Sequence, residues 1–386
     1  MAVYTEVPDG DLAKFVAEYE IGALVSCKGI AEGVENSNYL LKTSGGGTYI
    51  LMLYEKRVRA DDLPFFIALM QHLAAKGMNC PTPINDREGR ALKTLCGRPA
   101  ALISFLEGMW PRRPTEKHCH ALGAALADLH LKGRDFAMTR PNNLSVEGWR
   151  KLIADTEARA DEVEPGLGAR LQSEFAYLEA NWPKALETGV IHADLFPDNV
   201  FFLGDRLSGI IDFYFACTDF LAYDLAICIN AWCFQPDLSF NVTKAKLMFE
   251  SYRKLRPIPE EEMAAMPLLA RGAALRFLLT RLYDWLHHPP GAFVKPKDPV
   301  EYIRKLRFHQ GARDIGADGL SGVENHAMIG RQSKSSPTAP AAAIPAPAAG
   351  VPCCASAGWK RNCPAASRTP PTTAWNCWPR SLRWKP

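Results

Sequence analysis

One segment in the middle of the chain constrains its fold more than any other. Residues 190–202 have the sequence VIHADLFPDNVFF, in which two apolar stretches flank a short polar loop. Another apolar stretch follows and ends in the sequence IIDF at residues 210–213. Short apolar runs bounded by polar residues predict buried strands. We therefore predict strands that present Asp194, Asn199 and Asp212 at their ends.

The polar residues of this segment have a spacing that is associated with one kind of chemistry. Their pattern, H-x-D-L-x-x-x-N followed by an Asp at the end of the next strand, is that of a kinase catalytic loop. Phosphoryl transfer depends on positioning and charge neutralisation, so it needs few side chains in a fixed arrangement. Asp194 is predicted to orient the attacking hydroxyl and accept its proton, and His192 to support the loop. Asn199 and Asp212 offer hard oxygen ligands to Mg²⁺, so the pattern predicts an ATP- and Mg²⁺-dependent enzyme.

Two other interpretations of this segment remain open at this point. In one, His192, Asp194 and Asp198 are ligands of a catalytic zinc ion, although the other histidines supply no second spaced pair of the zinc-hydrolase type. In the other, the chain is a catalytically silent nucleotide-binding module. A single Asp in a turn is usually a cap or turn former, but the shared spacing of Asp194, Asn199 and Asp212 favours catalysis.

The N-terminal part of the chain predicts a sheet followed by a helix. Residues 24–42 and 48–53 have the composition of strands, and the sequence SGGG at residues 44–47 predicts a turn between them. Asp61 or Asp62 is predicted to cap a helix that ends at Gly77. An antiparallel sheet with a helix packed against it makes a small α+β lobe.

The rest of the chain is mostly helical in its pattern. An apolar run at residues 100–106 precedes Glu107-Gly108, as expected where a chain passes between two lobes. Helical periodicity begins at Thr115 and returns at residues 146–164 and 170–186. We predict a bilobal α+β fold with an antiparallel-sheet N-lobe at residues 1–103, a linker at 104–107 and a mostly helical C-lobe at 108–315.

The last part of the chain, residues 316–386, has a different composition. It is rich in Ala and Pro, and its last 28 residues contain four of the nine tryptophans. No helical or strand period is present there. We predict that this low-complexity tail is disordered, and we hypothesise that it is an out-of-frame extension. Functional arguments therefore use the residues before it.

Charge and cysteine content exclude several classes of protein. The net charge of +3 hides a tail with +6 and a remainder with −3, so the body carries no basic surface for nucleic acid or anionic membrane. The eleven cysteines contain no Cys-x-x-Cys pair, which favours reduced thiols. The N-terminal residues lack the pattern of a secretory signal. We expect a cytoplasmic protein with a small-molecule substrate and no nucleic-acid or membrane partner; the sequence does not set its oligomeric state.

Several segments together resemble one family of small-molecule kinases. They are GIAEGVENSNYLL at residues 29–41, LYEKRV at 53–58, DLPFF at 62–66, SFLEGMWPRRP at 104–114, VIHADLFPDNVFF at 190–202 and IDFYFACTDFLAYDLAICINAWCF at 211–234. This set resembles the aminoglycoside phosphotransferase-like superfamily, and more closely its bacterial homoserine kinase branch. The resemblance implies a protein-kinase-like fold and the formation of O-phospho-L-homoserine from L-homoserine and ATP in threonine biosynthesis. It also implies that Asp224 supports the catalytic loop and that adenine binds at the linker. Other alcohols, such as choline or an aminoglycoside, are the alternative substrates.

A second set of residues is predicted to bind ATP. Candidates are the Gly-bearing turn and its flanks, two basic residues after the second strand, and the linker: Gly29, Gly33, Asn36, Ser37, Asn38, Lys56, Arg57, Ser104 and Leu106. One departure from the protein-kinase pattern is clear, because Met52 stands where a phosphate-binding Lys is expected. Lys56 and Arg57 are the candidate replacements.

A pocket for homoserine needs an acidic side chain to bind the ammonium group and an Arg or Lys to bind the carboxylate. The candidates for substrate binding are Tyr214, Trp232 and Arg112. Further candidates are Arg113, Arg276, Arg281, Asp219 and Asp284. The sequence Trp-Pro-Arg-Arg at residues 110–113 disfavours an aminoglycoside, because a polycationic substrate requires an acidic pocket.

Overall fold

An antiparallel sheet forms the N-terminal lobe of the computed structural model, which describes residues 5–30, 36–55, 59–288 and 295–311. All of these residues belong to one compact unit, Met1–Gly330. Within the described residues the sheet has five strands in the order β1-β2-β3-β5-β4. The strands are β1 (Leu24–Ile30), β2 (Asn36–Thr43), β3 (Thr48–Tyr54), β4 (Leu92–Leu95) and β5 (Arg98–Ser104). The strand predicted at residues 48–53 and the turn before it are confirmed, whereas the stretch predicted at 24–42 contains two strands, β1 and β2.

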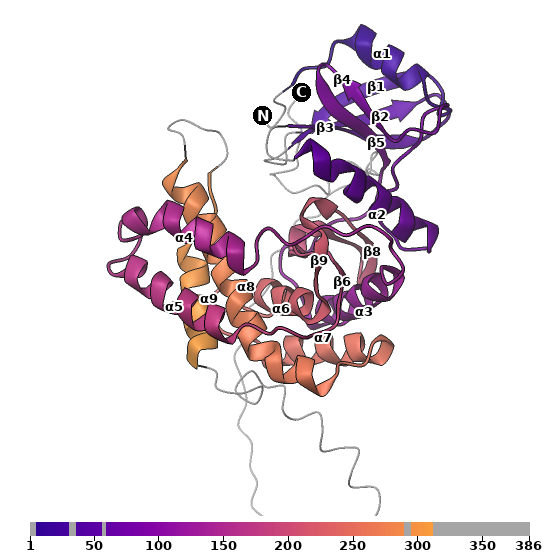
Figure 1. Cartoon of the computed structure of the whole chain (residues 1–386). Helices are drawn as coiled ribbons and strands as arrows, with labels where there is room; N and C mark the ends of the chain where they lie inside the picture. The colour runs from indigo at the N-terminus through magenta and orange to yellow at the C-terminus, as the bar shows by residue number, and fades with distance from the viewer. Residues whose placement is uncertain (1–4, 31–35, 56–58, 289–294, 312–386) are drawn as a thin grey trace, which may run out of the picture. The chain divides into compact units, whose positions relative to one another are not determined.

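Two helices cover opposite faces of this sheet, as Figure 1 shows. Helix α1 (Asp9–Ala17) packs on the outer face, with Leu51 and Leu53 of β3. Helix α2 (Leu63–Ala75) packs on the inner face, with Met52 and Tyr54. Successive residues of a strand point to opposite faces, so the alternation along β3 separates two small cores.

The start of α2 differs from the prediction that an Asp side chain caps it. Asp62 ends a 3₁₀ turn (Ala60–Asp62) and occupies the N-cap position, but its carboxylate makes no capping hydrogen bond. It accepts instead from the guanidinium of Arg140, at 2.9 Å, and Arg140 also donates to the carbonyl of Ala216. The cap prediction is wrong because a long-range ion pair from the C-terminal lobe takes the carboxylate.

Helices and two short two-stranded sheets make the C-terminal lobe. In both sheets the strands are antiparallel: β6 (Thr188–Ile191) pairs with β9 (Cys217–Phe220), and β7 (Val200–Leu203) pairs with β8 (Arg206–Ile210). The helices are α3 (Glu116–Lys132), α4 (Val146–Ala160), α5 (Leu167–Asn181), α6 (Leu221–Trp232), α7 (Val242–Leu255), α8 (Glu260–Leu286) and α9 (Val300–Gly311). Thr115 caps α3 with its side chain, while α4 and α5 end before the predicted limits.

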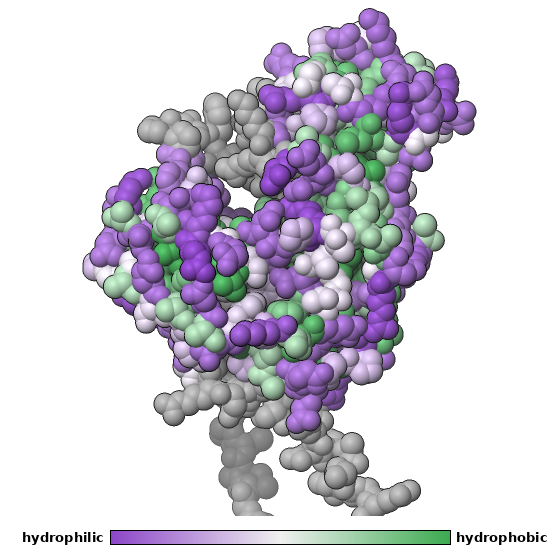
Figure 2. Space-filling view, in the orientation of Figure 1, coloured by the Kyte–Doolittle hydropathy of each residue, from purple (hydrophilic) through white to green (hydrophobic). Residues whose placement is uncertain are grey.

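The long helix α8 has the length and mean hydropathy of a membrane-spanning helix. In this lobe, however, it contacts α4, α6 and α9, and 61% of its most apolar window is buried. The face of the molecule drawn in Figure 2 is covered mainly by hydrophilic residues, with smaller hydrophobic areas between them. The contacts of α8 are therefore those of a core helix.

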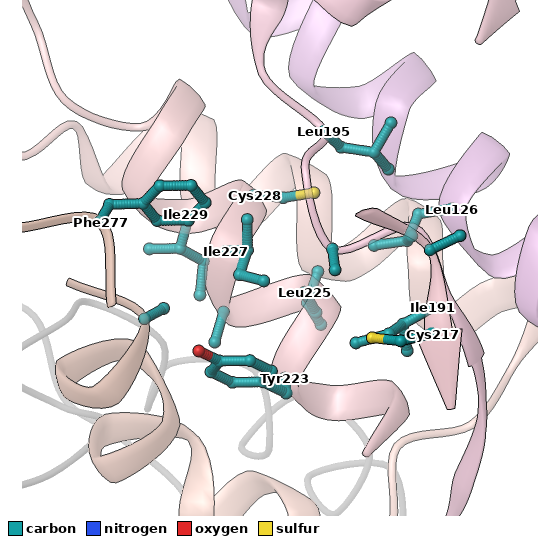
Figure 3. Close-up of a cluster of buried hydrophobic side chains, with 14 of the residues drawn as sticks. Leu126, Ile191, Leu195, Cys217, Tyr223, Leu225, Ile227, Cys228, Ile229 and Phe277 are labelled. Carbon is teal, nitrogen blue, oxygen red and sulfur yellow. The ribbon is translucent and has the colours of Figure 1, made fainter. Parts of the chain in front are cut away.

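Helix α6 is buried along almost its whole length beneath the residues that carry the predicted chemistry. Figure 3 shows Ile191 of β6 and Cys217 of β9 on one side of α6, and Phe277 of α8 on the other. All three side chains belong to the same hydrophobic core as α6. The segment between β6 and β7 therefore rests on a close-packed support.

Candidate active site

The catalytic loop, defined here as residues 192–199, connects β6 to β7 and so joins the two small sheets of the C-terminal lobe. The strand residues at its two ends, Ile191 and Val200, are fully buried, so apolar packing fixes both ends of the loop. The amide of Ile211 donates to the carbonyl of Asn199 at 2.9 Å. This bond brings the end of β8, and with it Asp212, next to the loop.

A single buried carboxylate holds the first turn of the loop. Asp224 of α6 accepts hydrogen bonds from the amides of His192 at 2.7 Å and Ala193 at 2.9 Å. Ala193 has a φ of 63°, a conformation that is unfavourable for any residue with a Cβ atom. Burial acts to raise the pKa of Asp224, but hydrogen bonds from His130 and the loop outweigh it and lower this pKa. Asp224 is therefore ionised and stabilises a strained backbone.

His192 joins the loop to the strand that precedes Asp212. Its Nε2 atom lies 3.0 Å from the carbonyl of Ile211 and must donate to it, while Nδ1 accepts from the amide of Asp194 at 3.3 Å. Burial lowers the pKa of His192 to about 4, which keeps the ring neutral and Nδ1 able to accept. Both ring nitrogens are used, and no group of three metal-binding residues occurs in the described ranges. The zinc interpretation is therefore not supported.

Asn199 fixes the position of Asp194. Its Nδ2 atom donates to the backbone carbonyl of Asp194 at 2.8 Å and to the carboxylate Oδ2 at 3.1 Å. No described residue donates to Asn199 Oδ1. Burial raises the pKa of Asp194 well above its ordinary value; the charges of Asp212 and Asp198 raise it further and Arg276 opposes them. The loop thus holds a carboxylate with an increased affinity for a proton, as a general base requires.

Asp212 lies at the end of β8 in a left-handed conformation, with a φ of 66°. The turn it begins places the next residue, Phe213, under the ring of His192, with ring centroids 4.8 Å apart. The side chain of Asp212 is exposed, and its charge acts on the pKa of Asp194. The loop and this turn therefore bring Asp194, Asn199 and Asp212 to one site.

Two of the predicted substrate residues, Tyr214 and Trp232, are buried beside the site. Tyr214 is buried between the lobes, where its hydroxyl lies 3.0 Å from the hydroxyl of Tyr54 and 3.0 Å from the sulfur of Met52. Trp232 is buried in the C-terminal lobe, and its Nε1 donates to the carbonyl of Leu195 at 2.7 Å. Both polar atoms are used inside the protein, which disfavours a hydrogen bond from either side chain to substrate.

The predicted nucleotide residues of the sheet fall into two groups by the direction of their side chains. Asn36 and Asn38 lie opposite Tyr54 and Met52 on β3 and share the inner face, and no described residue donates to their buried Oδ1 atoms. Ser37 faces the other way and donates to Glu55 at 2.8 Å. Gly29 is part of β1. Gly33, Lys56 and Arg57 lie outside the described residues.

The linker is hydrogen-bonded to the N-terminal lobe at its start and to the C-terminal lobe at its end. Ser104, the last residue of β5, accepts from the amide of Thr82 at 2.8 Å. The carbonyl of Glu107 accepts from Ser208 at 2.7 Å, and Gly209 lies so near Leu106 that a Cβ atom there would be 2.7 Å from it. The segment predicted to bind adenine therefore has a fixed relation to β8 and to Asp212 beyond it.

A cavity of about 300 Å³ adjoins the catalytic loop. Its lining comes from the segment after the linker, the loop itself and the ends of α6, α8 and α9: Trp110, Pro111, Arg112, Phe196, Pro197, Asp198, Ala231, Arg281, Lys297 and Glu301. We call it the charged cavity. Of the predicted candidates, Arg112 and Arg281 line it. Lys297 and Glu301 were missed, because nothing in their local sequence indicates a site.

The other candidates Arg276, Asp219 and Arg113 do not line the charged cavity. Arg276 is buried and donates to the carbonyl of Ala193, so it supports the catalytic loop from below. Asp219 accepts from Asn142 at 2.7 Å. Arg113 is exposed and does not line the charged cavity.

Comparison with known proteins identifies the family. The phosphotransferase enzyme family matches residues 26–258 of this chain. A homoserine kinase of Paramagnetospirillum magneticum is 63% identical over 326 residues, which make up 83% of this chain and 100% of that protein. The chain belongs to the homoserine kinases of the phosphotransferase enzyme family. A second homoserine kinase, of Rhodopseudomonas palustris, is 65% identical over 322 residues, or 82% of this chain and 98% of that one.

A solved structure supports the fold assignment of this homoserine kinase family member. The amicoumacin kinase hAmiN in complex with AMP-PNP, Ca²⁺ and Ami superposes with a TM-score of 0.60 at 13% identity. The superposition covers 80% of this chain and 94% of that one. At this identity the likeness concerns the fold alone, and it confirms the predicted bilobal, protein-kinase-like architecture.

Proposed function

We propose that this protein is an ATP-dependent homoserine kinase that acts in the cytoplasm on the route to threonine. It transfers the γ-phosphate of ATP to the hydroxyl of L-homoserine and forms O-phospho-L-homoserine and ADP. The observation that carries this proposal is the identity above 60% to homoserine kinases that the chain matches over nearly their full length. The arrangement of Asp194, Asn199 and Asp212 supplies the chemistry.

Asp194 is the proposed catalytic base. In the transfer, the hydroxyl oxygen of homoserine forms a bond to the γ-phosphorus as the bond to the β-phosphate oxygen breaks, and the hydroxyl proton passes to the Asp194 carboxylate. Asn199 holds that carboxylate, and burial raises its proton affinity. General bases of this kind contribute about 10²- to 10⁴-fold to the rate.

Asn199 and Asp212 are the proposed ligands of Mg²⁺. The amide nitrogen of Asn199 is bound to Asp194, so its Oδ1 is the atom left for a cation, and Asp212 offers an exposed carboxylate beside it. Hard oxygen donors of this kind fit Mg²⁺, and the mutual repulsion of the Asp194 and Asp212 charges favours a divalent cation here. When bound, Mg²⁺ neutralises charge on the phosphates.

Nucleotide binding is assigned to the inner face of the sheet and to the linker. Asn36 and Asn38 present buried amide oxygens on that face, while Ser37 can take part only through its backbone because its side chain is bound to Glu55. The linker at Ser104 and Leu106 would contact adenine. Gly29, Gly33, Lys56 and Arg57 remain proposed phosphate contacts, with the two basic residues in place of the absent Lys at Met52.

The test is ADP release by the full-length protein with MgATP and a panel of L-homoserine, L-serine, L-threonine, choline and kanamycin. We expect turnover with homoserine to exceed turnover with every other alcohol. Turnover that favours another alcohol would leave the phosphotransferase chemistry in place and refute the substrate. Absence of ADP release with all of them would refute the enzyme.

A further inference from the structure

We infer that the charged cavity recognises the amino-acid end of the substrate, with Arg112 and Arg281 binding the carboxylate and Asp198 binding the ammonium group. This inference rests on the proposed function, because it assigns the two charges that distinguish homoserine from a simple alcohol. It concerns binding and orientation, and it leaves the chemical step with Asp194.

The size and position of the cavity suit a short substrate. Its volume of about 300 Å³ is at the small end of the range for ligand pockets, about 300–1,000 Å³. Phe196, Pro197 and Asp198 line it and belong to the loop that carries Asp194. A short substrate bound there would lie against the loop that carries Asp194, with its hydroxyl directed toward that residue.

The cavity has more positive charge than its own ion pairs use. Glu301 binds Arg281 with one carboxylate oxygen at 2.6 Å and Lys305 with the other at 2.6 Å, so two cations share one anion. Arg112 is exposed and forms no ion pair with any residue that the structure describes. Within the Arg281–Glu301–Lys305 group, one positive charge is therefore not balanced by a carboxylate. The positive charge of Arg112 adds to this excess. A carboxylate between Arg112 and Arg281 would form charge-assisted hydrogen bonds.

An acid is also available at the same cavity. Asp198 pairs with Lys297 at 3.6 Å, and the two side chains are 51% and 62% exposed. Such a long, exposed ion pair contributes little, so an ammonium group can replace Lys297 as the partner of Asp198. The charges of both Asp198 and Lys297 act on the pKa of Asp194, which places them within electrostatic reach of the reacting hydroxyl.

The remaining lining explains which alcohols would be excluded. Trp110, Phe196 and Ala231 offer apolar surface for the methylene groups of homoserine. Choline and aminoglycosides carry positive charge without a carboxylate, and the excess of cationic side chains repels them. The cavity therefore selects a zwitterion.

The experiment compares two neighbouring arginines. Arg112→Gln removes a cavity cation, and Arg113→Gln removes an exposed cation that does not line the cavity. The substrates are L-homoserine, L-homoserine amide, which lacks the carboxylate charge, and 4-hydroxybutanoate, which lacks the ammonium group. For Arg112→Gln we expect KM for homoserine to rise about tenfold or more, with KM for MgATP unchanged.

The decisive readout is the preference of each variant between substrates, because a general loss of structure lowers all rates together. Arg112→Gln should reduce the preference for homoserine over its amide about tenfold, and Asp198→Asn should reduce the preference over 4-hydroxybutanoate by a similar factor. Arg113→Gln should change neither preference. Unchanged preferences in the first two variants, or equal changes in Arg113→Gln, would overturn the inference. Wild-type protein that ignores homoserine would instead overturn the proposed function itself.

Discussion

The catalytic loop and the charged cavity share three residues but are organised in different ways. In the loop, polar side chains bind main-chain groups: Asp224 holds two amides and Asn199 holds a carbonyl. In the cavity, long charged side chains bind each other, as Arg281 binds Glu301 and Lys297 binds Asp198. The first turn of the loop, His192 and Ala193, is buried, while Asp198 and Lys297 at the cavity are exposed.

This difference separates two tasks of the enzyme. Hydrogen bonds between buried side chains and the backbone hold the loop in one conformation. The reacting carboxylate of Asp194 is therefore in position before substrate binds. The exposed Asp198–Lys297 pair is weak and can be exchanged for bonds to an incoming ligand, whereas the Arg281–Glu301 pair is largely buried. We therefore expect substitutions in the loop to act on kcat, and substitutions in the cavity to act on KM and on substrate preference.

The largest effect is expected at the centre of the loop. Asp194→Ala should lower kcat by about 10³-fold, because it removes the proposed base, while binding of MgATP measured by calorimetry stays close to that of the wild type. A variant with nearly full turnover would show that the loop does not act on the hydroxyl. It would also refute the assignment of kcat to the loop and of KM to the cavity.

A smaller but distinct effect is expected at the proposed metal ligand. Asp212→Ala should weaken the binding of MgADP by about 100-fold, because a charged ligand of the cation is lost. Titration of ADP in the presence of EDTA provides the control, since metal-free nucleotide should bind the variant and the wild type equally. Equal loss under both conditions would point to a damaged nucleotide site and not to a metal ligand.

The support of the loop should affect both stability and rate. Asp224→Asn keeps the size of the side chain but leaves one loop amide without an acceptor, which costs about 2 kcal/mol in unfolding by urea. We expect kcat to fall about tenfold and KM for homoserine to stay unchanged. Asp205→Asn, an exposed change in the same lobe, serves as the control and should alter neither quantity. A rise in KM instead would link the loop support to the cavity.

The smallest expected effect tests whether the two regions are coupled by charge. Asp194 must be ionised to accept a proton, so kcat/KM should be lost as the pH falls through its raised pKa. Because the charge of Asp198 contributes to raising that pKa, Asp198→Asn should move the acid limb of the profile to lower pH. Arg113→Gln should leave the limb in place. If the acid limb does not move in Asp198→Asn, the loop and the cavity are not coupled through the charge of Asp198.

The catalytic loop could be predicted from the sequence because its residues lie close together along the chain. His192, Asp194 and Asn199 lie within a few residues, and the strand before Asp212 follows soon after, so spacing alone predicts that they meet. The α+β class followed equally from strand and helix periods. The support by Asp224 was available only through resemblance to a family, because its contact with the loop is long-range.

The cavity and the lobe contacts could not be predicted in the same way. Lys297 and Glu301 reach the site only when α9 packs on α8, and no local pattern marks them. Tyr214 and Trp232 are residue types that often line pockets, but here both side chains are buried and their polar atoms form internal hydrogen bonds. The local sequence predicts Asp62 as a helix cap, but its carboxylate binds Arg140, which is distant in the sequence.

The contact of Met52 and Tyr54 with Tyr214 has a consequence for how the enzyme can be controlled. Phe66 of α2 completes this group, with its ring centroid 5.5 Å from that of Tyr214. Kinases that join strand and helix by an ion pair can be switched by a change of charge. A contact between a thioether and aromatic rings carries no net charge, and salt does not screen it. We expect the contact between β3 and α2 to persist across ionic strengths, so a change in salt concentration alone would not release it.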